Sequence, residues 1–90
     1  MENLIGKRVM ATKLESVQYK DGHPNGIEEG FIKVGTLIEV EEGGQLKIIG
    51  NNSLFHTSTV VKIQDDLVYT RNSIYKVREF PNLEIDNNDN

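Results

Sequence analysis

The side chains with the clearest potential for metal chemistry are the two histidines, His23 and His56. A zinc site needs three or four nitrogen, sulfur or oxygen ligands, and the chain contains no cysteine to supply thiolates. His23 has Asp21 nearby in the chain, whereas His56 stands among residues with hydroxyl groups. We therefore predict that the chain holds no metal ion, and nothing in its sequence requires a cofactor.

The serines and paired carboxylates are the remaining candidates for catalysis. A nucleophilic serine needs a base beside it and usually sits in a strained turn, and neither Ser58 nor Ser73 is in such a motif. The pairs Glu28-Glu29 and Glu41-Glu42 are adjacent in the chain, and adjacent strand residues point to opposite faces. The glycines match neither a P-loop nor a dinucleotide fingerprint. We predict no catalytic residue, and hence that the protein is not an enzyme.

Binding is the chemistry that the remaining polar and aromatic residues favour. Tyr19, His23 and Asn25 lie in a stretch rich in turn signals, and Arg71 and Asn72 lie in a second polar turn. Aromatic and arginine side chains are enriched at binding hot spots, so we predict that these five residues contact a partner. The alternative is that the aromatic residues near these segments belong to the core and that the polar turn residues only cap their turn.

Short β-strands must position these residues, because no stretch shows a sustained helical period. Residues 7–15 alternate polar and apolar side chains, with Val9 and Ala11 on one face. Further strand-like runs cover residues 31–41, 45–49 and 54–63, and residues 67–77 hold two more runs around a polar turn. Residues 16–30 break all periodicity and predict a long loop.

The run 31–41 has the composition of a strand. Its alternation predicts that one face carries Ile32, Val34, Thr36, Ile38 and Val40, and that the other carries Lys33, Glu39 and Glu41. Gly35 in the middle indicates a bulge or a bend. Gly43-Gly44 predicts a two-residue hairpin turn into the next strand, and the segment 50–53 predicts another turn.

Five or six short strands with frequent turns predict an all-β domain. The order of the expected elements resembles that of an SH3-like barrel: one strand, a long loop, a hairpin, a further strand and a tight turn into the last strand. An OB-type barrel is the alternative, although the segment 50–53 is too short for its usual helix. We expect residues 1–81 to form the single domain and residues 82–90 to be a disordered acidic tail.

The net charge is −4, and the acidic residues gather in the middle of the chain. An acidic surface would steer the protein toward a basic partner. The residues expected to form that surface are Glu28, Glu29, Glu39, Glu41 and Glu42. Basic residues on the first and last strands leave a local nucleic-acid-binding face as an alternative.

The closing segment has the pattern Thr70-x-Asn72-Ser73-x-Tyr75, which resembles a motif in small accessory proteins of tailed phages. The Gly35-Thr36 step and the row Thr57-Ser58-Thr59 add to this resemblance. It implies a protein that binds a host protein or sequesters a small signal molecule.

The resulting hypothesis is a small non-catalytic protein that binds and modulates a partner protein, as a phage-encoded inhibitor of a host or defence factor would. The alternatives are an oligomer that sequesters a nucleotide-like molecule and a nucleic-acid-binding barrel. No signal peptide or membrane span is seen in the sequence, so we expect a cytoplasmic protein. The oligomeric state stays open.

Overall fold

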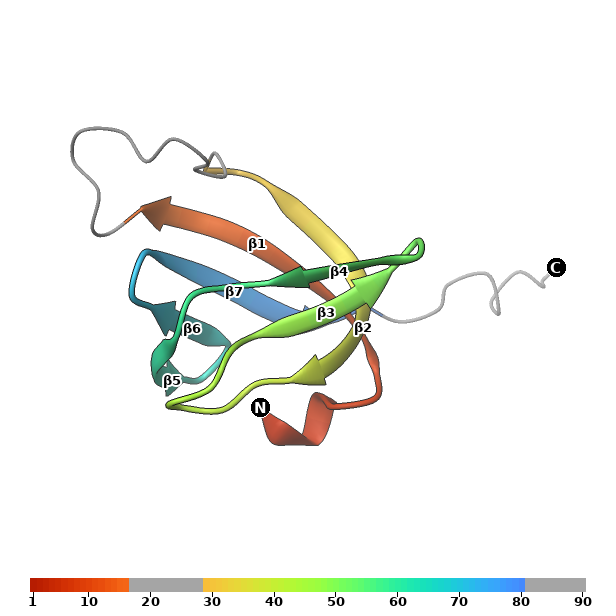
Figure 1. Ribbon diagram of the computed structural model, residues 1–90, viewed down its shortest axis with the longest axis horizontal. Coiled ribbons are helices and arrows are strands. Elements are labelled where there is room, and N and C mark those ends of the chain that lie inside the picture. Colours follow the sequence, from red (N-terminus) through yellow and green to blue (C-terminus); the bar gives the residue numbers. More distant parts are fainter. Residues whose placement is uncertain (17–28, 81–90) are drawn as a thin grey trace, which may run out of the picture.

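A curved antiparallel sheet forms the body of the molecule in the computed structural model, which describes residues 1–16 and 29–80 (Figure 1). These residues form seven strands in the spatial order β4-β3-β2-β1-β7-β6-β5. The elements are a 3₁₀ turn η1 (Glu2–Leu4) and strands β1 (Arg8–Ser16), β2 (Ile32–Glu39), β3 (Lys47–Gly50), β4 (Ser53–His56), β5 (Val60–Gln64), β6 (Leu67–Thr70) and β7 (Ser73–Glu79). The prediction of an all-β protein is confirmed.

The sheet curls without closing into a barrel. In the described part of the chain the edge strands β4 and β5 share no ladder. Instead, the loop after β2 is hydrogen-bonded to the first residue of β5. Gly43 N donates to Val60 O at 2.9 Å, and Val60 N donates to Gly44 O at 2.8 Å. The predicted five- to six-stranded SH3-like barrel is therefore not confirmed, because the described residues form one open antiparallel sheet of seven strands.

The predicted single strand 54–63 is wrong, because the chain leaves the sheet at Thr57 and divides the segment into β4 and β5. The Thr57 hydroxyl accepts a hydrogen bond from Leu46 N at 3.2 Å and donates to Ser58 O at 2.7 Å. Threonine side chains that bond the backbone in this way compete with strand pairing. Thr57 is buried, so the competing bonds are shielded from water.

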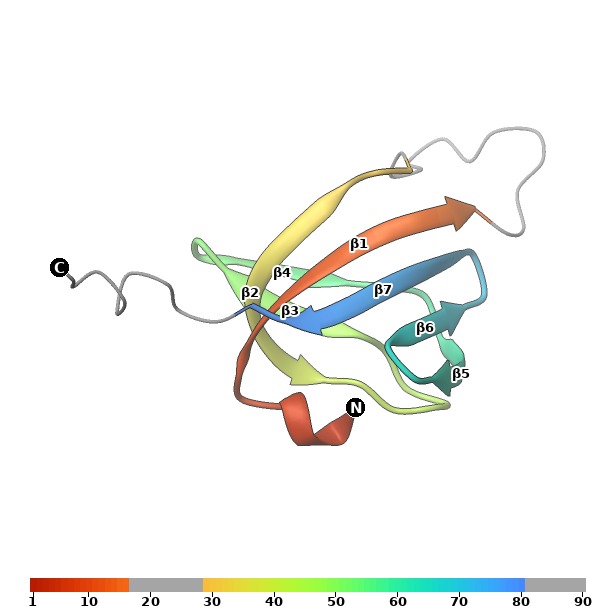
Figure 2. The ribbon, with the colours of Figure 1, turned by 180° about the vertical axis from the view of Figure 1, so that it is seen from behind.

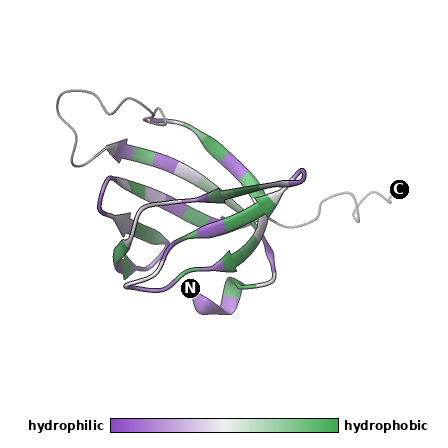
Figure 3. Cartoon of the chain, viewed as in Figure 1, coloured by the Kyte–Doolittle hydropathy of each residue, from purple (hydrophilic) through white to green (hydrophobic). Residues whose placement is uncertain are grey.

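The core lies on the concave side of the sheet and is almost entirely aliphatic. Figure 3 shows the matching alternation of hydrophilic and hydrophobic positions along β1 and β7. The prediction for β1 is confirmed, since Val9 and Ala11 are buried there. The buried hydrophobic residues are Val9, Ala11, Leu37, Val40, Leu46, Ile48, Val60, Val68, Tyr75 and Val77.

The face predicted for β2 is correct as far as Ile38, which lies on the outer side with Ile32, but Val40 does not share it. Leu37 is fully buried opposite Ile48, whereas Ile32 and Ile38 are 53% and 44% exposed. The ladder between β2 and β3 is irregular between Leu37 and Glu39, and this bulge brings Val40 back to the core beyond the strand. A one-residue change of phase moves side chains to the other face of a strand, which explains why Val40 is buried although Ile38 is exposed.

Glycines let β2 and β3 pass unusually close to each other. A Cβ atom at Gly35 would collide with the carbonyl oxygen of Ile49, and a Cβ atom at Gly50 would lie 2.7 Å from Val34 O. The register irregularity expected at Gly35 lies two residues later, between Leu37 and Glu39. Gly35 therefore serves a close backbone approach, the other common role of glycine inside a strand.

The turn predicted at residues 50–53 is confirmed, whereas the turn predicted at Gly43-Gly44 is part of a longer connection. Asn51 and Asn52 both have positive φ, 52° and 62°, which is typical of the primed turns that join twisted hairpin strands. The strands β2 and β3 do form a hairpin, but its connection runs over residues 40–46 and is not a two-residue Gly43-Gly44 turn.

The turn between β6 and β7 is held by Thr70. Its buried hydroxyl accepts a hydrogen bond from Ser73 N at 3.0 Å and donates to Ser73 O at 2.9 Å. We expect Thr70→Val to lower the free energy of unfolding by about 2 kcal/mol, because both Ser73 groups lose a buried partner. Urea unfolding measures this difference, and Thr70→Ser, which keeps the hydroxyl, is the control. Equal losses in the two variants would contradict the role of the hydroxyl.

Candidate binding surface

Three of the five predicted contact residues, Tyr19, His23 and Asn25, lie outside the described residues. The other two come together in the β6–β7 turn, where Arg71 is exposed and Asn72 is half-buried. Arg71 N donates to Thr59 O at 3.0 Å, and Asn72 N donates to the Ser58 hydroxyl at 3.3 Å. The backbone of this turn is thus tied to the segment between β4 and β5, which leaves the Arg71 side chain on the surface.

The aromatic residues of the described chain differ in burial: Tyr75 is buried, Phe55 is half-buried and Phe31 is 36% exposed. Phe55 stacks on Phe31 with ring centroids 5.6 Å apart and meets the edge of Tyr75 at 5.7 Å. Burial raises the pKa of the Tyr75 hydroxyl, partly offset by a hydrogen bond with Ser73. Tyr69 instead lies on the outer side of β6, where the Lys62 ammonium sits 5.3 Å from its ring centroid.

Several predicted acidic surface residues hold the backbone together. Glu39 accepts a hydrogen bond from Gln45 N at 3.1 Å and pairs with Lys47 at 3.3 Å. These two contacts lower the pKa of the Glu39 carboxyl below its usual value. Glu42 accepts from Ile63 N at 3.1 Å and so covers part of the open edge of β5.

The outer, convex side of β2, β3 and β4 carries an apolar patch. Ile32, Ile49 and Leu54 are 53%, 43% and 51% exposed. Ile49 lies opposite Thr36 on β2 and opposite Leu54 on β4, so these side chains form a cross-strand row. With half-buried Val34 they make up the apolar patch: Ile32, Val34, Ile49 and Leu54.

A basic row borders this patch on the neighbouring strands β1 and β7, which lie side by side in Figure 2. It consists of Arg8, Lys76 and Arg78. Arg78 lies opposite Met10, which in turn lies opposite Val34 of the patch. In residues 1–16 and 29–80 none of the three cations takes part in an ion pair.

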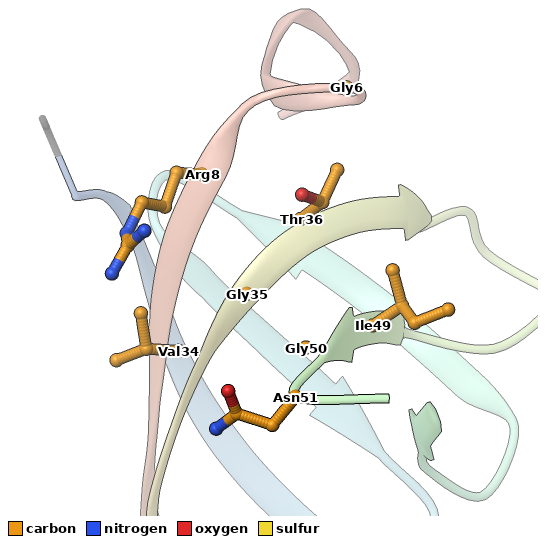
Figure 4. Close-up of a pocket in the computed structure, with 8 residues that line it drawn as sticks. All are labelled: Gly6, Arg8, Val34, Gly35, Thr36, Ile49, Gly50 and Asn51. Atoms are coloured by element: carbon orange, nitrogen blue, oxygen red, sulfur yellow. The ribbon is translucent and has the colours of Figure 1, made fainter. Parts of the chain in front are cut away.

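A pocket of about 460 Å³ lies where the basic row meets the apolar patch. Figure 4 shows the Arg8 and Val34 side chains near each other, with Asn51 on the far side of Val34. The pocket is lined by Gly6, Arg8, Val34, Gly35, Thr36, Ile49, Gly50 and Asn51. It therefore combines one cation, a hydroxyl, an amide and two aliphatic side chains.

The described part of the chain shows neither a metal cluster nor a membrane-spanning helix. Residues 1–16 and 29–80 contain no group of three or more potential ligands from histidine, cysteine, aspartate and glutamate. Within these ranges, no helix is long and apolar enough to span a membrane.

Comparison with known proteins finds no matching family model, no matching curated protein and no matching solved structure.

Proposed function

We propose that this protein is a non-catalytic binding module that docks a partner protein on the outer face of β1 to β4. The observation that carries the proposal is the apolar patch, in which three large aliphatic side chains are more than two-fifths exposed on neighbouring strands. Contiguous exposed apolar surface of this kind marks interaction sites in soluble proteins. The resemblance of the closing turn to phage accessory proteins supports the narrower proposal that binding inhibits a host factor.

The partner is proposed to combine apolar and acidic side chains. The apolar patch borders three cations that pair with no carboxylate of the described chain, so a partner carboxylate gains complementary charge there. This reverses the polarity of the partner expected from the acidic middle of the sequence, since Glu39 and Glu42 bind backbone amides. A second copy is a poorer fit, because a two-fold contact through this face brings two basic rows together.

The proposal is tested with Ile49→Asp, which places a charge in the centre of the patch. The matched control is Val61→Asp, because Val61 is also aliphatic, is 55% exposed, and lies on β5, which is separated in the strand order from β2, β3 and β4 by β1, β7 and β6. A partner recovered from host lysate is purified and titrated against both variants by calorimetry. We expect Ile49→Asp to weaken binding by about 30-fold or more, as at other hot spots, and Val61→Asp to bind like the unsubstituted protein.

Two results would overturn this proposal. One is a partner that binds the Ile49→Asp variant as tightly as the unsubstituted protein. The other is a dimer in light scattering that Ile49→Asp dissociates, because the patch would then be occupied by a second copy.

A second candidate function, single-stranded nucleic-acid binding, is favoured by one specific arrangement. Lys62 lies over Tyr69, and Arg8 lies 5.4 Å from the ring centroid of Phe80, so the basic outer face also carries aromatic rings. Rings among cations are typical of surfaces that stack bases. Fluorescence anisotropy with a labelled single-stranded oligonucleotide at low salt separates the two functions, because only this one predicts binding that Arg78→Ala weakens.

A further inference from the structure

We propose that the pocket between the basic row and the apolar patch binds a side-chain carboxylate of the partner, with a neighbouring aliphatic side chain of the same segment against the patch. This inference rests on the proposed function and names the chemistry that the docking face selects. The pocket is where the two kinds of surface meet, so a ligand that fills it must satisfy both.

Arg8 supplies the cation of the pocket and is held in place by its surroundings. Its guanidinium lies 5.4 Å from the ring centroid of Phe80, and Phe80 N donates to Arg8 O at 2.8 Å. A cation over an aromatic face loses little of its ability to bind an anion at its edge, because the guanidinium donors lie in the guanidinium plane. Arg8 forms no ion pair within the described chain, so its donors are not neutralised there.

Part of the pocket lining is aliphatic. Val34 and Ile49 line it from β2 and β3, and Ile49 continues the row to Leu54 on β4. An aliphatic ligand group buried here is favoured by the removal of apolar surface from water. A small hydrophilic anion would leave this part of the lining exposed, which is why the structure favours a carboxylate attached to an apolar segment.

Two neutral polar side chains, Thr36 and Asn51, complete the lining. Thr36 points outward from β2 between the arginine and Ile49, and Asn51 begins the turn after β3. A hydroxyl and an amide can donate to a carboxylate without adding charge. One arginine with neutral donors matches the single charge of a carboxylate, whereas phosphate sites commonly gather several cations.

The experiment is a selection of random peptides displayed on a carrier, performed in parallel on the unsubstituted protein and on Arg8→Gln. We expect the unsubstituted protein to enrich peptides in which aspartate or glutamate neighbours leucine, isoleucine or valine. Arg8→Gln is expected to keep the aliphatic preference and lose the acidic one. The control is Arg71→Gln, which removes the same charge from an exposed arginine on the β6–β7 turn.

A double-mutant cycle then measures the contact directly. The best enriched peptide and its Glu→Gln or Asp→Asn version are titrated against both proteins. We expect the peptide substitution to weaken binding to the unsubstituted protein about tenfold or more, as for a charged hydrogen bond, and to leave binding to Arg8→Gln unchanged. An amidated peptide that binds as tightly as the free acid confirms that the carboxylate is a side chain.

Each failure has a distinct meaning. Enriched peptides with no acidic residue, or equal peptide losses in both proteins, overturn the carboxylate pocket and leave the proposed docking face intact. A tight requirement for the free chain terminus overturns the side-chain assignment. The same selection is also performed on Ile49→Asp. If this variant enriches the same peptides as strongly as the unsubstituted protein, the proposed docking face itself is overturned.

Discussion

Replacing Gly35 by alanine is expected to lower the free energy of unfolding by about 3 kcal/mol or more, the upper range for overpacked interiors. The added Cβ atom collides with the carbonyl oxygen of Ile49 and lies 2.9 Å from a methyl group of Ile48. The first of these is a backbone atom of the adjacent strand, so no side-chain rotation relieves the contact. Urea unfolding followed by far-ultraviolet circular dichroism measures the loss.

Gly43→Ala is the matched control for this experiment. Gly43 has φ of +88°, and no atom lies within 4 Å of the position that a Cβ atom would take there, so alanine meets backbone strain without a steric collision. Strain of that kind amounts to about 1 to 2 kcal/mol. If Gly35→Ala destabilised the protein less than Gly43→Ala, this result would contradict the close approach of the β2 and β3 backbones at Gly35.

The second large effect is expected at Leu37, the inward-facing residue of β2. Leu37 is fully buried, so we expect Leu37→Ala to lower the free energy of unfolding by about 3 kcal/mol through lost packing and a residual cavity. Its neighbour Ile38 is 44% exposed, and Ile38→Ala is expected to change stability by less than about 1 kcal/mol. The two variants are compared by urea unfolding under the same conditions.

This pair tests which face of β2 points to the core. If Ile38 faced inward and Leu37 faced outward, the two losses would be reversed. Similar losses of stability in the two variants would contradict the register shift between Leu37 and Glu39 in the pairing of β2 with β3. The unfolding slope with denaturant should be equal in both variants, because neither substitution changes the surface exposed on unfolding by much.

The outer face could be predicted only in part because β2 is aliphatic on both sides. Ile32 and Val34 alternate with polar residues and look like a core face, whereas Leu37 is the only large aliphatic residue of the opposite phase. A correct assignment needs the partner strands, since Leu37 is buried by pairing with Ile48. The aliphatic residues of the apolar patch can therefore be identified in the sequence, but their position together on the outer face cannot.

The pocket depends even more on distant contacts. Arg8 on β1, Thr36 on β2 and Asn51 after β3 are separated by long stretches of chain and meet only because three strands lie side by side. The two glycines of the β2–β3 crossing bring these strands together, yet each glycine alone indicates only a bend or a turn. Of the five predicted contact residues, the structure describes only Arg71 and Asn72, and it places them in the β6–β7 turn.

The β class, the positions of most strands and the turns follow from local sequence patterns, because alternation and the preference of glycine and asparagine for positive φ act over a few residues. Three other features depend on contacts between distant segments: Thr57 divides a strand, Leu37 rather than Ile38 is buried, and an apolar patch meets three cations. These features depend on register between strands. A shift of one residue reverses both faces of a strand without changing its local pattern.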